Sequence, residues 1–417
     1  MAVLVPAALA VPPAQPAPMV DERLIEIGRP SPRFMRKYGL NWFSDGDNEE
    51  YFAPELLTLR EAEVEHFRVQ AASLYELALR AARHVSEHQL WAAAGIPDNA
   101  VELVEHSLRR ETGLHLAGRF DFAGGLGRAP LKLLEFNADT FSLAPETATV
   151  MPHQLELLPR PYRKDARQYN NLLSGLVQSF RRILNQQPNR KPSLLLSGLG
   201  NEEDWLNLDL IAMAARQAGF QEVELLALEK VVFSEDDGIF IEVGPEQYQQ
   251  FDFWFKMAPW DFIAFEEPEL MDLLSKIVKR GLATVLNPAY SMLLQSKALL
   301  PFMNELAPHH PALLRSSLNQ EDMPNGDTYV SKPIFGRTGD NVSIFRHGRL
   351  AQANEGDYGD FPMLYQELAR FDQDVDGDCY QPSVFSAGSE PCALCLRRQD
   401  GLIVDDDAEF VGHVILE

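Results

Sequence analysis

Arg119-Phe120-Asp121-Phe122 and Leu133-Leu134-Glu135-Phe136-Asn137-Ala138-Asp139 are the two stretches that decide the fold around the candidate site. Side chains along a strand point alternately to its two faces. Arg119 therefore shares a face with Asp121, and Glu135 shares a face with Asn137. The glycine-rich segment 124–127 between them predicts a turn. We expect a hairpin that gathers Asp121, Glu135 and Asn137 beside Arg119, and these oxygen ligands suit Mg²⁺.

The composition is that of an ordinary globular protein. Of 417 residues, 46% are apolar and 24% are charged, and this length allows one to three domains. Acidic residues (61) outnumber basic ones (37), which gives a net charge of −24. This balance disfavours nucleic acid, whose affinity comes largely from Lys and Arg contacts to phosphate. It is compatible with a cationic substrate, but it is also typical of a self-repelling, soluble surface.

Cysteines and targeting signals are sparse. The three cysteines, Cys379, Cys392 and Cys395, are too few for a disulfide framework. Cys392 and Cys395 have redox or zinc spacing, but they lack a second pair and lie in an apolar run, so we expect two core residues. Residues 1–20 are rich in Ala and Pro without Lys or Arg, which predicts a disordered tail rather than a secretion signal. No apolar run reaches the roughly 18 residues of a membrane span, so we expect a cytoplasmic protein.

Hydrophobic periodicity predicts both helices and strands. Helices are expected over 58–88, 99–110, 165–187, 201–218, 268–280 and 293–306, the last holding Lys297. Strands are expected over 193–197, 222–228, 239–243, 251–257, 329–334, 342–346 and 364–368, with a hairpin over 393–404 that turns at 399–401. Because this order lacks a regular βαβ rhythm, it favours an α+β fold with mixed or antiparallel sheets and flanking helices.

Three further segments could bind a nucleotide. Lys332 precedes the glycine-bearing loop 335–341, which could place a cation and backbone N–H groups over phosphates, although an ordinary hairpin explains it equally well. Lys297 could be a solvated helical lysine. Gln366 could face an adenine edge or lie on a plain edge strand. Taken together with the carboxylate hairpin, these are the parts of an ATP site.

The order of these segments resembles the glutathionylspermidine synthase family, whose synthetase region has the ATP-grasp fold. The resemblance covers about residues 35–417 and rests on blocks at 119–121, 134–140, 255–261, 287–301, 332–342 and 365–367, with a looser match over 396–410. It implies a nucleotide cleft between lobes in a single catalytic region, 21–417. Within it, about 21–285 would serve substrate and metal, and about 286–417 would serve the nucleotide and a lid.

The resemblance also implies roles for individual residues. Arg119 resembles the catalytic arginine, and Asp121, Glu135 and Asn137 resemble the Mg²⁺ ligands, with two ions expected to accompany ATP. The residues similar to ATP contacts are Lys297, Lys332, Gln366, Glu367, Leu368 and Gln381. Those similar to substrate contacts are Thr140 and Ser142 near the carboxylate, Arg337 and Arg397 closing over it, and Glu202, Glu203 and Glu409 toward the amine.

The implied activity is an ATP-dependent, ADP-forming ligase that joins a peptide or glutathione carboxylate to a polyamine or other amine through an acyl-phosphate. A homodimer is compatible with this reading, and neither nucleic acid nor membrane is expected as a partner. Two departures are visible: Phe141 stands where the family often has Pro, and the lack of cysteine before Cys379 predicts a ligase without an amidase domain. The alternatives are a non-catalytic ATP-binding sensor and a metal-dependent hydrolase.

Overall fold

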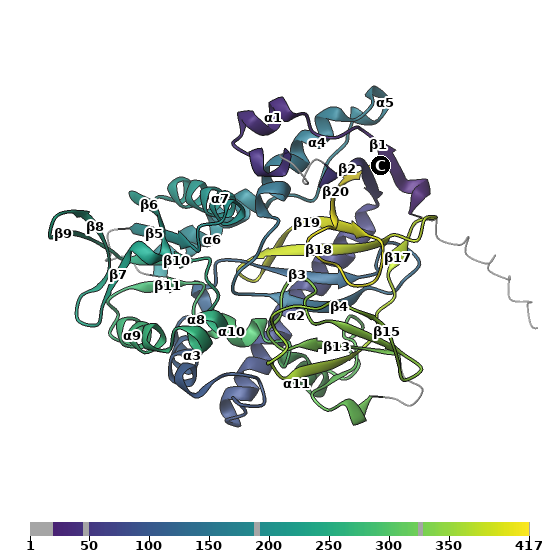
Figure 1. Ribbon diagram of the computed structural model, residues 1–417. Helices are drawn as coiled ribbons and strands as arrows, with labels where there is room; N and C mark the ends of the chain where they lie inside the picture. The colour runs from purple at the N-terminus through teal and green to yellow at the C-terminus, as the bar shows by residue number, and fades with distance from the viewer. Residues whose placement is uncertain (1–19, 45–49, 187–191, 324–327, 417) are drawn as a thin grey trace, which may run out of the picture.

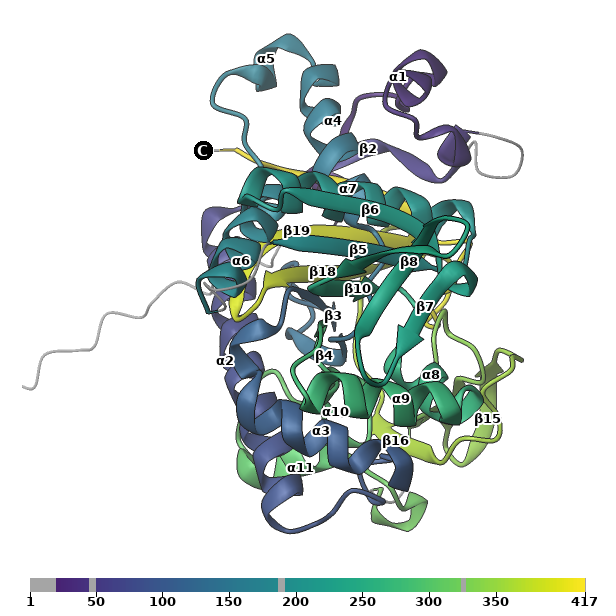
Figure 2. The same cartoon turned by 90° about the vertical axis from the view of Figure 1, so that its left-hand side faces the viewer.

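The computed structural model describes residues 20–44, 50–186, 192–323 and 328–416. The predicted N-terminal tail therefore lies, up to residue 19, outside the described residues. Four sheets and the helices between them form a mixed α/β fold (Figures 1 and 2). No described helix is both long enough and apolar enough to cross a membrane.

The largest sheet is mixed and contains strands from both ends of the chain. Its order is β1-β2-β20-β19-β18-β3-β4, with β17 paired to β18. Only the β2–β20 pair is parallel among these strands. The strands are β1 (Leu24–Glu26), β2 (Phe52–Leu59), β3 (Gly118–Ala123), β4 (Lys132–Asn137), β17 (Asp372–Gln373), β18 (Cys379–Ala387), β19 (Glu390–Gln399) and β20 (Glu409–Ile415).

Helices cover both faces of this sheet. Leu394 and Leu396 of β19 belong to the apolar cluster of α2 (Glu61–Glu87), whereas Ala393 and Cys395 belong to that of α6 (Leu172–Gln186). Because neighbouring residues of a strand face opposite ways, α2 and α6 pack on opposite faces. Cys392 and Cys395 are buried, as predicted, and burial raises the pKa of each thiol to about 12.

The hairpin predicted over 393–404 is present as an antiparallel pair, but its loop is longer and its returning strand begins later than predicted. β19 runs unbroken to Gln399, and the returning strand β20 begins only at Glu409. The side chain of Asp405 explains the wider loop, because it accepts a hydrogen bond from Gln399 Nε2 at 2.7 Å while its own N–H donates to Gln399 Oε1 at 2.8 Å.

A second, wholly parallel sheet was not predicted. Its order is β11-β10-β5-β6, formed by β5 (Ser193–Gly198), β6 (Glu222–Ala227), β10 (Phe253–Lys256) and β11 (Thr284–Leu286). The helices after its strands are α7 (Glu202–Ala218), α8 (Trp260–Glu266) and α9 (Pro268–Lys279). A three-stranded antiparallel sheet, β7 (Val231–Ser234), β8 (Gly238–Gly244) and β9 (Gln247–Phe251), interrupts the βαβ order and hides it in the sequence.

The last sheet is antiparallel and carries the predicted lysine hairpin. Its order is β12-β16-β13-β14-β15, with β12 (Ser316–Ser317), β13 (Tyr329–Pro333), β14 (Ser343–Arg346), β15 (Arg349–Ala353) and β16 (Met363–Glu367).

The remaining helices are α1 (Pro32–Lys37), α3 (Asp98–Arg110), α4 (Met151–Leu157), α5 (Arg160–Arg163), α10 (Tyr290–Gln295) and α11 (Leu299–Leu306). α6 begins at Leu172 rather than at the predicted residue 165.

The predicted helix over 293–306 is broken at Lys297. Ser296 adopts an extended backbone, with φ −59° and ψ 120°, and its Oγ donates to the Ala94 carbonyl at 2.7 Å. The Lys297 N–H then donates to the Ile334 carbonyl at 2.9 Å instead of to the preceding helical turn. Lys297 is consequently 7% exposed rather than solvated.

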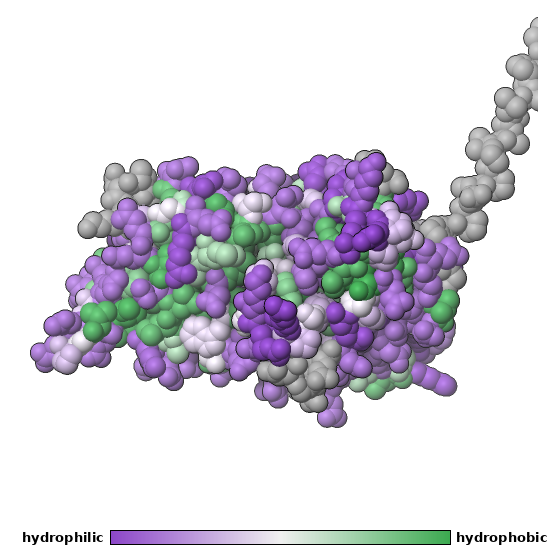
Figure 3. All heavy atoms as spheres, turned by 90° about the horizontal axis from the view of Figure 1, so that it is seen from above, coloured by the Kyte–Doolittle hydropathy of each residue, from purple (hydrophilic) through white to green (hydrophobic). Residues whose placement is uncertain are grey.

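The visible surface is mainly hydrophilic (Figure 3). Seen from above, hydrophilic residues cover most of the visible face, and apolar residues form separate patches between them (Figure 3).

Candidate active site

The predicted hairpin is confirmed. β3 and β4 pair antiparallel, with Asp121 opposite Glu135 and Arg119 opposite Asn137. Asn137 Nδ2 donates to Asp121 Oδ2 at 2.9 Å and to Glu135 Oε1 at 3.1 Å. The hairpin therefore brings two carboxylates and one amide into a single cluster.

Arg119 orders the cluster from one side. Its Nε and NH2 groups donate to the two Asp121 carboxylate oxygens at 2.8 and 2.9 Å, a bidentate pair. Its NH1 group donates to the Ser142 carbonyl at 2.9 Å and to Ser142 Oγ at 3.0 Å. Ser383 Oγ donates to Asp121 Oδ1 at 2.7 Å. Asp121 is thus fixed in one orientation, and Arg119 connects it to the loop after β4.

Two lysines approach the cluster from the other side. Lys297 Nζ lies 3.1 Å from Glu135 Oε2 and donates to the Gly336 carbonyl at 2.8 Å. Lys332 Nζ donates to the Leu134 carbonyl at 2.8 Å. Burial alone would raise the pKa of Glu135, but the ammonium groups of Lys297 and Lys332 outweigh it and lower that pKa to about 2. Burial lowers the pKa of Lys332 to about 8.

These groups line one cavity of about 670 Å³. All but two of the predicted site residues lie on its wall: Arg119, Asp121, Glu135, Asn137, Thr140, Ser142, Glu203, Lys297, Lys332, Arg337, Gln366, Glu367, Leu368, Gln381 and Arg397. Residues more than 270 positions apart in the sequence therefore meet here, because β18 and β19 pair beside β3 in the large sheet.

Two predicted substrate contacts do not reach the cavity. Glu202 is exposed at the start of α7 and is not among the lining residues. Glu409, on β20, accepts hydrogen bonds from Arg398 Nε at 2.7 Å and from Arg29 NH2 at 3.3 Å. Its carboxylate is therefore paired within the protein. Glu203, one residue after Glu202, is the acidic residue of this group that lines the cavity.

Three acidic side chains, Glu203, Asp204 and Asp406, line the cavity near one another, since the charges of both aspartates act on Glu203. Burial, followed by the negative charges of Asp406 and Asp204, raises the pKa of Glu203. Burial likewise raises the pKa of Asp406, although the Arg397 guanidinium opposes this shift. A bound cation beside these residues would relieve the repulsion between their carboxylates.

The two predicted substrate arginines are held by protein groups. Arg337 NH2 donates to both carboxylate oxygens of Asp261, at 2.7 and 2.9 Å. Arg397 donates from Nε and NH2 to the Ala408 carbonyl at 3.0 and 2.8 Å. Sequence reasoning assigned no role to Asp261, although it lies in one of the blocks that carry the family resemblance.

One buried side-chain amide on β16 is unpaired within the described part of the chain. Gln366, on β16, is 2% exposed, and its Nε2 has no hydrogen-bond partner among the described residues. The apolar side chains of Leu134, Val330 and Phe371 line the cavity with it. A buried amide in an apolar slot needs a partner, which a bound ligand can supply.

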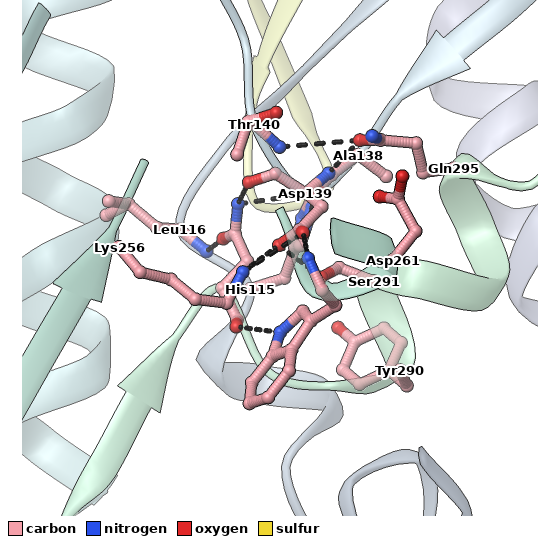
Figure 4. A network of polar contacts seen from close by, with 12 residues as sticks. His115, Leu116, Ala138, Asp139, Thr140, Lys256, Asp261, Tyr290, Ser291 and Gln295 are labelled. Atoms are coloured by element: carbon pink, nitrogen blue, oxygen red, sulfur yellow. Dashed lines mark hydrogen bonds and ion pairs between the residues drawn. The ribbon is translucent and has the colours of Figure 1, made fainter. Parts of the chain in front are cut away.

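A second acid–lysine pair is buried next to the cavity-lining residue Thr140. Asp139, 1% exposed, accepts hydrogen bonds from Lys256 Nζ at 2.9 and 3.0 Å, from Ser291 Oγ at 2.9 Å and from the Trp260 N–H at 2.6 Å (Figure 4). Asn287 Nδ2 donates to the Asp139 carbonyl at 2.8 Å. This network ties the end of β4 to β10, α8 and α10. Its residues lie in three of the blocks that carry the family resemblance, but sequence reasoning assigned them no role.

The donor set suits one metal in particular. No group of three or more His, Cys, Asp or Glu side chains in the described parts of the chain is arranged to hold a metal ion. The hairpin offers two carboxylates and the Asn137 amide, whose nitrogen faces both. A half-turn of that amide exchanges its nitrogen for its oxygen. Mg²⁺ commonly binds one or two carboxylates together with water and substrate phosphates, so these residues fit it.

Comparison with known proteins gives consistent matches. The family described as glutathionylspermidine synthase preATP-grasp matches residues 23–416. A putative acid–amine ligase of Haemophilus influenzae is 28% identical over 326 residues, which are 75% of this chain and 77% of that protein. The bifunctional glutathionylspermidine synthetase/amidase of Escherichia coli is 22% identical over 347 residues, 80% of this chain and 54% of that one.

More distant similarity extends the pattern. Glutathionylspermidine synthase of Crithidia fasciculata is 27% identical over 309 residues, which are 66% of this chain and 41% of that protein. The chain thus spans about half the length of the two glutathionylspermidine enzymes. A glutathione synthetase-like effector of Globodera pallida shares the fold, with a TM-score of 0.53 at 10% identity, over 93% of this chain and 98% of that one.

Proposed function

The chain belongs to the glutathionylspermidine synthase preATP-grasp family, and from this premise we propose that it is an ATP-dependent ligase that joins a carboxylate to an amine. One observation carries the proposal. Arg119, the cluster of Asp121, Glu135 and Asn137, and the ammonium groups of Lys297 and Lys332 line the same cavity. Cations and carboxylates held this close suit phosphoryl transfer, where positioning and charge neutralisation supply most of the catalysis.

The proposed reaction activates a poor electrophile. A carboxylate resists attack by an amine because its oxygen is a poor leaving group. Transfer of the ATP γ-phosphoryl group to that oxygen forms an acyl-phosphate and releases ADP. The neutral amine then attacks the acyl carbon, the amide forms, and phosphate leaves.

Different charged side chains would bind the nucleotide, the transferred phosphoryl group and the amine. Lys297 and Lys332 would bind the ATP phosphates, and Arg119 would stabilise the phosphoryl group during transfer. The bond from Arg119 to Ser142 supports this role, because it connects the arginine with the loop proposed to hold the carboxylate substrate. Glu203, beside Asp204 and Asp406, would face the amine.

We propose that Asp121, Glu135 and Asn137 hold Mg²⁺, which when bound neutralises and orients the phosphates of ATP. Neighbouring residues fix the orientation and the charge of these metal ligands. Arg119 fixes the orientation of Asp121 through its bidentate pair. The two lysines keep Glu135 ionised, since its pKa is lowered to about 2.

The loop between β13 and β14 is the proposed lid. It begins after Pro333 and includes Gly336 and Arg337, which line the cavity. Lys297 contacts the loop through the Gly336 carbonyl, and Asp261 contacts it through Arg337. A closed lid would protect an acyl-phosphate from water.

Phosphate release tests the proposal. Purified protein would be incubated with ATP and Mg²⁺, and with glutathione or short peptides as acids and spermidine or related polyamines as amines. We expect ADP, phosphate and an amide product to form together when both an acid and an amine are present. If ATP binds but no acid and amine pair stimulates its cleavage, the chain is a non-catalytic nucleotide-binding protein.

A further inference from the structure

Helix α8 presents aromatic side chains to the cavity. Its opposite face is buried through Trp260, Ile263 and Ala264. Phe262 and Phe265 are 37% and 41% exposed, and both line the cavity. Residues three apart on a helix share a face, so the two rings form one apolar wall. Large apolar side chains exposed inside a concave site are typical of ligand contacts.

The two rings differ in what they contact. Phe265 packs against Phe361 with ring centroids 5.1 Å apart and against Phe335 at 6.1 Å. Part of its ring is therefore occupied by contacts with the protein, including one with the proposed lid loop. Phe262 makes no ring contact within the described residues and is left facing the cavity. Its exposed area is therefore available to a ligand.

Phe262 lies on a helix whose first residue is bonded to the residue before Thr140. The Trp260 N–H donates to Asp139 Oδ2 at 2.6 Å, which fixes the start of α8 beside the residue that precedes Thr140. Phe262 follows Trp260 by two residues, well within one helical turn of about 5.4 Å. Thr140 and Ser142 line the same cavity, and Arg119 bonds to Ser142. The start of α8 thus lies beside the loop proposed to hold the carboxylate, while Phe265 extends the aromatic wall to the lid.

The cation beside this wall is already neutralised. Arg337 donates to both oxygens of Asp261, whose side chain is 4% exposed. A second carboxylate on the substrate would have to compete with Asp261 for this arginine. The wall therefore offers apolar area and a closed ion pair, which suits an uncharged group.

We propose that the acid substrate carries one carboxylate and an aromatic or similarly apolar group, and that Phe262 selects this group. The inference rests on the proposed ligase function and specifies its acid. The competing occupant of the wall is the base of ATP. The buried, unpaired Gln366 amide and the apolar residues Leu134 and Val330 line the nucleotide-side sheet instead, which favours the base there.

A hydroxylamine trap tests the selectivity without knowledge of the amine. Hydroxylamine attacks an acyl-phosphate at the acyl carbon, forms a hydroxamate and releases phosphate. N-benzoylglycylglycine and N-acetylglycylglycine each carry one carboxylate. They differ only in the N-acyl group, which has a phenyl ring in the first acid and a methyl group in the second. With ATP and Mg²⁺, we expect the wild-type protein to use the benzoyl acid with a kcat/KM about tenfold or more higher.

Variants assign the selectivity to one side chain. Phe262→Ala should bring the ratio of the two acids close to one, whereas Phe262→Leu should keep part of the preference. Tyr248→Ala is the matched control, because Tyr248 is 55% exposed on β9 and does not line the cavity. The control should retain the wild-type ratio.

Different failures have different meanings. Equal kcat/KM values for the two acids in the wild type, or hydroxamate from glutathione alone, would overturn the inference and leave the ligase proposal standing. A Phe262→Ala variant that changes only the KM for ATP would assign the wall to the nucleotide and would also overturn it. If no acid gives hydroxamate although ATP binds, the ligase proposal fails and the inference fails with it.

Discussion

The acids of two acid–lysine pairs, Glu135 and Asp139, lie only four residues apart, but the two pairs have different surroundings. Glu135 and Lys297 face the cavity, with side chains 26% and 8% exposed, whereas Asp139 and Lys256 are sealed at 1% and 0%. Glu135 keeps open coordination for a ligand, but Asp139 accepts four hydrogen bonds from three other segments. The difference shows that residue type alone does not identify a catalytic or ligand-binding pair. We propose that the pair whose side chains reach the cavity is the functional one.

Removing Asp139 should have the largest effect, and on stability. Asp139→Ala leaves the Lys256 ammonium buried without its partner, and breaking a buried pair in this way lowers the free energy of unfolding by about 3–5 kcal/mol. Urea denaturation of the purified variant measures the loss. The double variant Asp139→Ala/Lys256→Met should recover part of it, because no buried charge remains. A loss below about 1 kcal/mol in the single variant would show that the pair is not structural.

Removing Glu135 should affect turnover instead. Glu135→Ala takes one carboxylate from the proposed Mg²⁺ cluster, and loss of one such group reduces the rate on the order of 10²–10³-fold. We expect its unfolding transition in urea to stay close to that of the wild type. Wild-type turnover of this variant at saturating Mg²⁺ would exclude Glu135 as a metal ligand. The two acid–lysine pairs would then not differ in catalytic role.

The charge of Lys332 should make ATP binding depend on pH. Burial lowers the pKa of this amine to about 8, so its positive charge is present below pH 8 and lost above it. ATP affinity should therefore fall as the pH rises above 8, by up to about tenfold per pH unit. Lys332→Arg should keep the affinity over pH 7 to 9.5, because arginine stays charged. A flat ATP titration for the wild type across this range would contradict the assignment.

Neighbouring glutamates give the smallest expected effect. Glu203 lines the cavity and Glu202 does not, so Glu203→Gln should raise the KM for a polyamine severalfold while Glu202→Gln leaves it unchanged. Steady-state kinetics at a fixed acid concentration separates the two variants. Equal effects would mean that general negative charge, rather than a cavity contact, attracts the amine.

Local patterns predicted the parts of the site that lie within one segment. The alternation of Arg119 with Asp121, and of Glu135 with Asn137, specified the hairpin because a one-residue slip would turn these groups to the other face. The order of family-like blocks then predicted fifteen residues that share the cavity, including Gln381 on β18.

Contacts between distant segments explain what the sequence did not reveal. The break at Lys297 depends on Ser296 and Ile334, and tertiary hydrogen bonds there outweigh helix propensity. Asp261 and Asp139 looked like ordinary acidic residues until their partners, Arg337 and Lys256, were in place. The pairing of Glu409 with Arg398, outside the cavity lining, depends on the register of β19 and β20 and was not visible in the sequence.

The central claim is that the β3–β4 hairpin holds the metal that positions ATP. A crystal structure with Mn²⁺ in place of Mg²⁺ and a non-hydrolysable ATP analogue tests it most directly, since Mn²⁺ is located by its anomalous signal. We predict a peak at ligand distance, about 2.0–2.2 Å, from oxygens of Asp121 and Glu135, with Lys297 and Lys332 on the phosphates. A peak elsewhere, or a nucleotide whose phosphates lie away from this hairpin, would contradict the account.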